Sequence, residues 1–285
     1  MEIRKIGVMG AGSMGGGIAQ VAAQAGFQVV LNDIEVSFVD RSFSRMEAFF
    51  DKSIEKGKLT EEQKEEILGR IQKSTDVSDF TDTDLVVEVI IEELELKKKA
   101  FSQLEAICRP ETYFLTNTSS MPITLLANAT ERPEKVAGMH FFNPPPIMKL
   151  VEIIRGYYTS DETVKVISTV AEKMGKVSVE VKKDYPGFIV NRVMMAQYLE
   201  AIKLVEEGVA SPEDIDTAVK LGLNHPMGPF ELHDFTGTDI GYFVAEYLNE
   251  EFKDIRWNPP QTLKALIRAG RLGRKSGAGW YNYNK

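Results

Sequence analysis

Three glycines near the start of the chain constrain its fold more than any other feature. Gly10, Gly12 and Gly15 follow an apolar run and open a segment with helical periodicity. In a strand-to-helix connection, the first glycine permits a tight turn, the second lets a pyrophosphate approach the backbone, and the third lets the helix pack closely on the strand. A helix beginning near Ser13 and Met14 would direct the positive end of its dipole at those phosphates. The pattern therefore predicts a dinucleotide-binding unit.

An acidic residue at the end of the next apolar run completes this unit. Asp33 lies 23 residues after Gly10, where a carboxylate can accept hydrogen bonds from the adenosine ribose. A 2′-phosphate would meet the negative charge of Asp33, and no arginine follows closely until Arg41. We therefore expect NAD rather than NADP as the cofactor.

Apolar runs and helical patterns alternate through the first half of the chain. The apolar runs occupy residues 6–9, 29–31, 85–90, 113–115 and 136–139, and helical patterns occupy residues 14–25, 39–56 and 96–107. Strands that are apolar throughout and alternate with helices are typical of a parallel sheet covered on both faces. Beyond Pro186 only helical patterns remain. We predict an α/β fold, with a Rossmann-type, mostly parallel sheet domain over residues 1–186 and an all-helical domain over residues 187–285.

Two of the expected helices carry start signals. Thr60 precedes Gln63 by three residues, which is the pattern of a capping box. Ser211 is followed directly by Pro212, which predicts serine as the N-cap and proline at the first helical position.

Composition excludes several classes of protein. The chain has 34 Lys and Arg against 42 Asp and Glu, a formal net charge of −8, so nucleic acid is not expected as a partner. No apolar run reaches about 18 residues, so we expect no membrane span. Cys108 is the only cysteine, and His225 and His233 have no third ligand in the sequence, so neither a disulfide nor a metal site is expected. The chain enters a strand at once without a secretory signal, and we expect the cytoplasm.

A predicted hairpin places a carboxylate opposite a histidine. Strand patterns at residues 135–141 and 150–154 flank a proline run, which cannot continue a ladder and forces a turn. If the strands fold back about Pro146, positions whose numbers sum to 292 face each other, as those of His140 and Glu152 do. Directly opposed residues have Cβ atoms about 4.5–5.5 Å apart. A carboxylate there would fix the imidazole tautomer and stabilise its charged form, as a general base requires. A buried salt bridge without chemistry is the alternative interpretation.

Several longer motifs make the chain resemble the L-3-hydroxyacyl-CoA dehydrogenase family, and its short-chain bacterial members above all. The resemblance covers essentially the whole chain. It rests on residues 10–19, 117–120, 139–144, 148–152, 186–192, 225–229 and 273–277. One departure is Pro145, because family members more often carry a small or aliphatic residue between the two outer prolines, and this proline would stiffen the turn.

The resemblance implies a reversible, NAD-linked oxidation of the 3-hydroxyl group of an acyl-CoA thioester. His140 would be the catalytic acid/base and Glu152 its partner. Ser119 would hydrogen-bond the 3-oxygen of the substrate, and Asn191 would contact the reacting acyl portion from the second domain. The active site is expected in the cleft between the domains, at the carboxyl edge of the sheet.

The resemblance also implies contacts to the cofactor, the substrate and a second subunit. The residues that would touch the ribose or nicotinamide end of the cofactor are Glu92, Lys97, Ser119, Asn143 and Lys275. Lys52 and Lys56 would contact the phosphates of coenzyme A, although a solvated helix face is the other interpretation of these lysines. Dimers joined through the helical domain are expected.

Two other functions compete with this one. A β-hydroxyacid dehydrogenase acting on free acids would share the glycine loop, but those enzymes rely on a lysine acid/base in the helical domain. A dinucleotide-binding protein without turnover would have no need for the set formed by His140, Glu152, Ser119 and Asn191.

Overall fold

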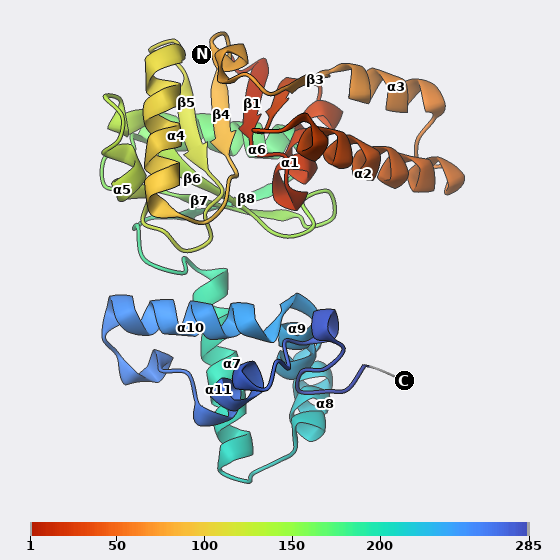
Figure 1. Ribbon diagram of the computed structural model, residues 1–285, viewed down its shortest axis with the longest axis vertical. Coiled ribbons are helices and arrows are strands. Elements are labelled where there is room, and N and C mark those ends of the chain that lie inside the picture. The colour runs from red at the N-terminus through yellow and green to blue at the C-terminus, as the bar shows by residue number, and fades with distance from the viewer. Residues whose placement is uncertain (1, 284–285) are drawn as a thin grey trace. The chain divides into compact units, whose positions relative to one another are not determined.

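The computed structural model describes residues 2–283, and the chain divides into two compact units between Tyr185 and Pro186. The first unit holds a sheet with helices on both of its faces; in the view of Figure 1, helix α4 (Leu94–Ile107) lies in front of the sheet and helix α6 (Asp161–Lys173) behind it. The second unit consists of helices and short turns.

Eight strands of the described chain form one sheet in the order β3-β2-β1-β4-β5-β6-β7-β8. Their bounds are β1 Lys5–Met9, β2 Gln28–Asn32, β3 Ile71–Ser74, β4 Leu85–Glu88, β5 Tyr113–Thr116, β6 Val136–Phe141, β7 Leu150–Ile154 and β8 Val177–Val181. All neighbours run parallel except β6 and β7, which are antiparallel. The predicted mostly parallel sheet is confirmed.

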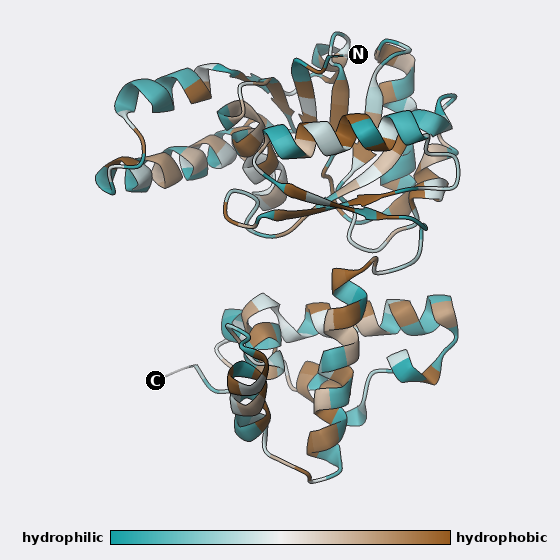
Figure 2. Cartoon of the chain, turned by 180° about the vertical axis from the view of Figure 1, so that it is seen from behind, coloured by the Kyte–Doolittle hydropathy of each residue, from teal (hydrophilic) through white to brown (hydrophobic). Residues whose placement is uncertain are grey.

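Burial explains which strands the sequence predicts. Every residue of β4, β5 and β6 is buried, so these strands carry continuous apolar runs. Strands β3 and β8 are not predicted from the sequence; they lie at the two edges of the sheet and are largely exposed along their middle residues. An edge strand exposes one side and therefore lacks the apolar run. Figure 2 shows apolar residues concentrated on the strands, whereas the helices carry both kinds of residue.

Of the remaining helices of the first unit, the sequence predicts all but the short one over residues 123–127, and it does not predict α6 either. The remaining helices are α1 (Ser13–Gln24), α2 (Val36–Glu55), α3 (Glu61–Gly69) and α5 (Ile123–Ala127), with 3₁₀ turns η1 (Val77–Phe80) and η2 (Pro133–Lys135). The predicted capping box opens α3: the Thr60 hydroxyl accepts from the Gln63 backbone N–H at 3.3 Å, and the side-chain Oε1 of Gln63 accepts from the Thr60 backbone N–H at 3.0 Å. The capping box prediction is confirmed.

The second unit packs its helices around an apolar core. Its elements are α7 (Val190–Glu206), α8 (Pro212–Leu223), α9 (Pro229–Thr236), α10 (Thr238–Phe252) and α11 (Gln261–Arg268), with η3 (Ile255–Trp257) and η4 (Arg274–Ser276). Tyr198, Phe230 and Leu248 are buried in its centre. Ser211 caps α8 by accepting from the Asp214 N–H at 3.1 Å, as predicted. Within the described residues, none of the helices has the length and apolarity needed to span a bilayer.

Candidate active site

The glycine loop after β1 leaves open space where a phosphate would approach. Gly10 has a φ of 110°, in the left-handed region, and a Cβ there would lie 2.5 Å from the carbonyl oxygen of Val89. A Cβ at Gly15 would lie 1.8 Å from the carbonyl oxygen of Gly10, so only glycine lets α1 pack here. At Gly12, by contrast, no described atom lies within 4 Å of the Cβ position. Two glycines shape the turn, and the third leaves its backbone accessible.

The first turn of α1 follows this loop directly. Gly12 is the N-cap residue, Ser13 and Met14 form the first turn, and that turn contains no acidic residue. The unpaired backbone N–H groups at such a helix start attract an anion. The loop and the helix start therefore have the chemistry of a pyrophosphate site.

Asp33 both holds the glycine loop and faces the ligand side. Its Oδ2 accepts a hydrogen bond from the Ala11 N–H at 2.7 Å, and its Oδ1 accepts from the Ile34 N–H at 2.8 Å. Each carboxylate oxygen keeps further lone pairs that ribose hydroxyls could use. A substitution at Asp33 would therefore change the loop as well as the ribose contact.

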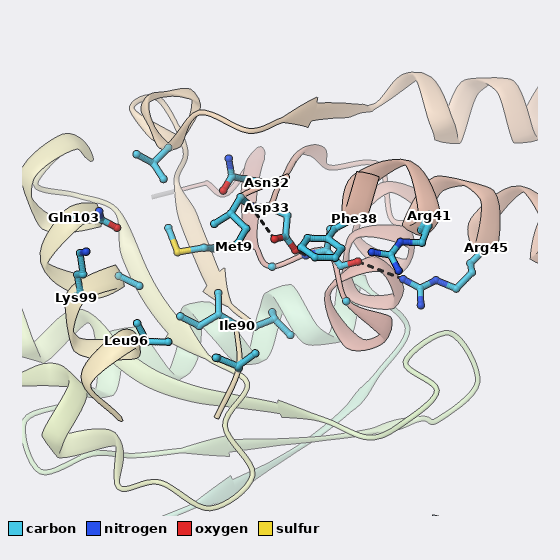
Figure 3. Close-up of a pocket in the computed structure, with 18 residues that line it drawn as sticks. Met9, Asn32, Asp33, Phe38, Arg41, Arg45, Ile90, Leu96, Lys99 and Gln103 are labelled. Carbon is cyan, nitrogen blue, oxygen red and sulfur yellow. Dashed lines mark hydrogen bonds between the residues drawn. The ribbon is translucent and has the colours of Figure 1, made fainter. Parts of the chain in front are cut away.

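A pocket of about 670 Å³ opens beside Asp33 and the loop. One wall is formed by Phe38 and Arg41 of α2, and Figure 3 shows Leu96 and Gln103 of α4 on the opposite side. Apolar side chains form most of the lining, with fewer polar groups among them, which is the usual make-up of a site for an aromatic ligand such as adenine. Together with the loop, the pocket can hold the adenosine half of a dinucleotide.

The structure confirms the predicted register of the hairpin. His140 of β6 stands opposite Glu152 of β7, and the flanking pairs, such as Phe141 with Val151, keep the same sum of residue numbers. The imidazole Nδ1 lies 2.8 Å from Glu152 Oε2. His140 is 6% exposed and Glu152 is 1% exposed. The pair is a close, almost fully buried contact between an imidazole and a carboxylate.

Asn117 connects this hairpin to the loop that carries Ser119. The ladder between β5 and β6 ends at the pair Thr116 and Gly138. One residue further, the side-chain oxygen of Asn117 accepts the Phe141 backbone N–H at 2.8 Å. The loop after β5 is thus bonded to the strand segment next to the proposed acid/base. No role is expected for Asn117 from the sequence, although a polar residue directly after a buried parallel strand is a signal for one.

Three of the predicted cofactor residues lie together. Glu92 Oε1 accepts from the Thr118 hydroxyl and from the Ser119 N–H, the latter at 3.3 Å, while Glu92 Oε2 lies 3.2 Å from Lys97 Nζ. The side chain of Glu92 is 40% exposed, whereas that of Lys97 is 1% exposed. Of the two charged groups, Glu92 is the one that a ligand can reach. A direct ligand contact by Lys97 would require it to give up a protein partner.

The proline turn after His140 packs on the cofactor helix. Asn143, which the resemblance assigns to the cofactor, is exposed at the start of this turn. A Cβ at Gly17 of α1 would lie 2.8 Å from the ring of Pro145, so the unusual middle proline contacts α1 directly. Lys176 donates to the carbonyl oxygens of Pro145 and Met148, the latter at 2.8 Å. The turn is therefore held from two sides.

The other predicted contact residues lie on exposed or half-buried surfaces. Lys52 and Lys56 are exposed at the C-terminal end of α2 in the first unit. In the second unit, half-buried Asn191 lies in the first turn of α7, and exposed Lys275 forms an ion pair with Asp239 at 2.6 Å.

The histidines of the second unit show no sign of a metal site. His225 is exposed in the loop before α9. His233 is 1% exposed, and its ring centroid lies 3.4 Å from that of Tyr198. Burial lowers the pKa of His233 from 6.5 to about 3. Among the described residues, no group of three or more His, Cys, Asp or Glu side chains could hold a metal ion.

Comparison with known proteins covers both units. Residues 5–185 match the family described as 3-hydroxyacyl-CoA dehydrogenase, NAD binding domain, and residues 187–283 match its C-terminal domain. The chain is 51% identical over 279 residues to a probable 3-hydroxybutyryl-CoA dehydrogenase of Deinococcus radiodurans, covering 98% of this chain and 100% of that protein. It is 44% identical to the 3-hydroxybutyryl-CoA dehydrogenase of Bradyrhizobium diazoefficiens, covering 99% and 96%. The crystal structure of (S)-3-hydroxybutyryl-CoA dehydrogenase from Ralstonia eutropha superposes with a TM-score of 0.97 at 43% identity, and the match covers all of both chains.

Proposed function

The chain belongs to the 3-hydroxyacyl-CoA dehydrogenase family of NAD-dependent oxidoreductases, and we propose that it interconverts acetoacetyl-CoA and 3-hydroxybutyryl-CoA. The names of its relatives support a short-chain acyl-CoA substrate, which belongs to fatty acid metabolism. The observation that carries the mechanism is the buried pair of His140 and Glu152, with 2.8 Å between Nδ1 and Oε2.

His140 is the proposed acid/base at the 3-oxygen. In the oxidation of the hydroxyacyl substrate, the imidazole takes the proton of the 3-hydroxyl group; in reduction it returns that proton. Glu152 holds the ring through Nδ1 and stabilises the imidazolium cation that forms. Because Glu152 is 1% exposed, water screens this attraction little.

The residues of the first unit fit NAD. The open backbone at Gly12 and the start of α1 would hold the pyrophosphate, and the carboxylate of Asp33 would hold the adenosine ribose. When bound, NAD supplies the hydride acceptor, and the protein supplies position and charge. Glu92, Asn143 and Lys275 are the proposed contacts at the other end of the cofactor, on the strength of the resemblance.

Ser119 and Asn191 are the proposed substrate contacts near the reacting carbon. Ser119 lies in the loop that is bonded through Asn117 to the strand carrying His140, which supports its role at the 3-oxygen. Lys52 and Lys56 are proposed to attract the coenzyme A phosphates, since both ammonium groups lie on an exposed helix end.

Self-association through the second unit and a cytoplasmic location remain predictions. Large apolar side chains of the second unit that are mostly exposed support an interface between two copies; they include Val193, Leu221, Phe235 and Phe243. Sedimentation of the purified protein would test the dimer.

One assay separates the proposed function from its two rivals. The rate of NADH oxidation is measured with acetoacetyl-CoA, with free acetoacetate and without a carbonyl substrate. Rapid turnover of the thioester alone supports the proposal. Equal rates with the free acid would favour the β-hydroxyacid dehydrogenase, and NADH binding without turnover of either would favour a non-catalytic dinucleotide-binding protein.

A further inference from the structure

A lysine and a glutamate are buried together beneath the loop that carries Ser119. The Lys97 side chain is 1% exposed, that of Glu88 is fully buried, and Nζ lies 2.7 Å from Glu88 Oε1. An ion removed from water costs several kcal/mol unless a partner of opposite charge offsets the loss. A buried ion pair of this kind is therefore costly in free energy, and its position calls for an explanation.

The ammonium group of Lys97 has three contacts inside the protein. Its contacts are Glu88 at 2.7 Å, Glu92 at 3.2 Å and the carbonyl oxygen of Ile90 at 3.4 Å. The contacts to Glu88 and Ile90 are hydrogen bonds, and the contact to Glu92 is an ion pair. Lys97 thus lies between an inner carboxylate and an outer one.

The Glu88 carboxylate is held by the loop after β4, by α4 and by β5. Its Oε1 accepts from the Ile90 N–H at 2.7 Å in addition to Lys97 of α4, and its Oε2 accepts from the Thr116 hydroxyl of β5 at 2.7 Å. Glu88 and Thr116 are also register partners in the sheet. The carboxylate of Glu88 is therefore held in place by protein contacts alone.

Glu92 is the exposed carboxylate of this group of three charged side chains. Its Oε1 accepts from the Ser119 N–H and the Ser120 hydroxyl, each at 3.3 Å, and from the Thr118 hydroxyl. An exposed carboxylate gains little from a solvated partner, but Lys97 is buried and offers a fixed cation. Lys97 therefore determines where the Glu92 carboxylate lies, and Glu92 bonds three successive loop residues.

We propose that Glu88 is a positioning residue for the reaction. Glu88 holds the ammonium of Lys97, Lys97 holds Glu92, and Glu92 holds the loop so that Ser119 meets the 3-oxygen of the substrate. Without the charge of Glu88, the ammonium has only Glu92 as a counter-charge and draws that carboxylate away from the loop. The inference rests on the proposed role of Ser119.

The contacts that lead from Glu88 through Lys97 and Glu92 to the loop are called the relay below. Three variants and one control test it. Glu88→Gln and Lys97→Met each leave one buried charge without its partner, and the double variant Glu88→Gln/Lys97→Met removes both. Lys98→Met is the matched control, because Lys98 lies on the same helix and pairs with Glu95 at the surface. The measurements are the denaturant midpoint, kcat with acetoacetyl-CoA and KM for NADH.

If the relay exists, stability and kcat should respond differently in the double variant. Each single variant should unfold at a lower denaturant concentration and lose about tenfold to a hundredfold in kcat, because a small displacement of a substrate-positioning group has effects of this size. The double variant should regain much of the stability, since replacing a buried pair by neutral groups is often neutral. Its kcat should stay low, because Glu92 still lacks its cation. KM for NADH should also rise in Glu88→Gln, because the displaced Glu92 is itself a proposed cofactor contact.

A purely structural pair would behave differently. In that case kcat would recover together with stability in the double variant, and this result would overturn the inference. A second check is Lys97→Met in a Ser119→Ala background, where the relay predicts little additional loss of kcat because both changes act through the same contact. Fully additive losses would refute a route through Ser119.

The experiment also distinguishes the inference from the proposed function. If the parent protein did not turn over acetoacetyl-CoA, the proposed function would fail, and the inference with it. If the parent were active but Ser119→Ala had parental kcat, the function would stand and the positioning route would be wrong.

Discussion

Replacing Glu152 with glutamine should lower kcat strongly while the affinity for the cofactor hardly changes. The side chain keeps its size and an oxygen that can accept from Nδ1, so the change removes mainly the negative charge. In the structure that charge is 2.8 Å from the imidazole, and both groups are at least nine-tenths buried. The charge matters only when the imidazole carries a proton, which occurs during the reaction.

The geometry sets the expected size of the effect. At 2.8 Å and an effective dielectric constant of about 20, the attraction between unit charges is about 6 kcal/mol. Desolvation of the pair offsets part of this, so a net stabilisation of about 2–4 kcal/mol is reasonable. At about 1.4 kcal/mol for each factor of ten, kcat should fall roughly 30- to 1,000-fold. His140→Ala should lose about 10²- to 10⁴-fold, the usual contribution of general acid/base catalysis.

The assay is steady-state oxidation of 3-hydroxybutyryl-CoA by NAD, the direction in which the imidazolium forms, with NAD binding and the folded fraction measured separately. Glu180→Gln is a matched control, because Glu180 lies on the neighbouring strand β8 and pairs with Arg155 rather than with His140. It should keep parental kcat. If Glu152→Gln and His140→Ala both lost stability but kept near-parental kcat per folded molecule, the pair would be a buried salt bridge without chemistry, and the catalytic assignment would be wrong.

Three further outcomes can be measured on the same protein. Asp33→Asn should narrow the preference for NADH over NADPH in kcat/KM by about tenfold or more, because the charge that repels a 2′-phosphate is gone; a parent that used NADPH equally well would contradict the argument. With a thioester truncated at the coenzyme A end, both kcat and affinity should fall, since binding energy from the remote part of the substrate positions the reacting carbon. An unchanged kcat with the truncated thioester would contradict this use of binding energy. Because the pKa of His233 is lowered to about 3 from 6.5, the unfolded chain takes up a proton between these values that the folded chain does not, so stability falls as pH decreases through this window. At pH 5 the free energy of unfolding should be about 2 kcal/mol lower than at neutral pH, and this difference should disappear in His233→Met. Unfolding can be followed by the fluorescence of the two tryptophans, both in the second unit. An unchanged dependence of stability on pH in His233→Met would refute this origin.

Features that depend on a few neighbouring residues follow from the sequence. The glycine loop, the capping box of Thr60 and the N-cap of Ser211 are local, because their partners lie within a few residues along the chain. The contact between His140 and Glu152 is also predictable from sequence, although it joins two strands, because the strands are consecutive and the proline turn between them sets the register of the hairpin. The edge strands β3 and β8 escape prediction, since their exposure leaves no continuous apolar run.

Other features arise only when remote segments pack together. The sequence shows Lys97 as one of three consecutive lysines on a helix, and a solvated face is the ordinary interpretation of such a run. The structure buries Lys97 against Glu88, because α4 packs over the carboxyl end of β4 and turns this one lysine inward. In the same way, Asn117 meets the Phe141 N–H only because β5 and β6 are neighbours in the sheet. Chain-local geometry therefore determines which groups the protein carries and the short-range contacts among them. The environment that gives a buried charge its partner depends on the packing of segments that are distant in sequence, and only the tertiary structure decides it.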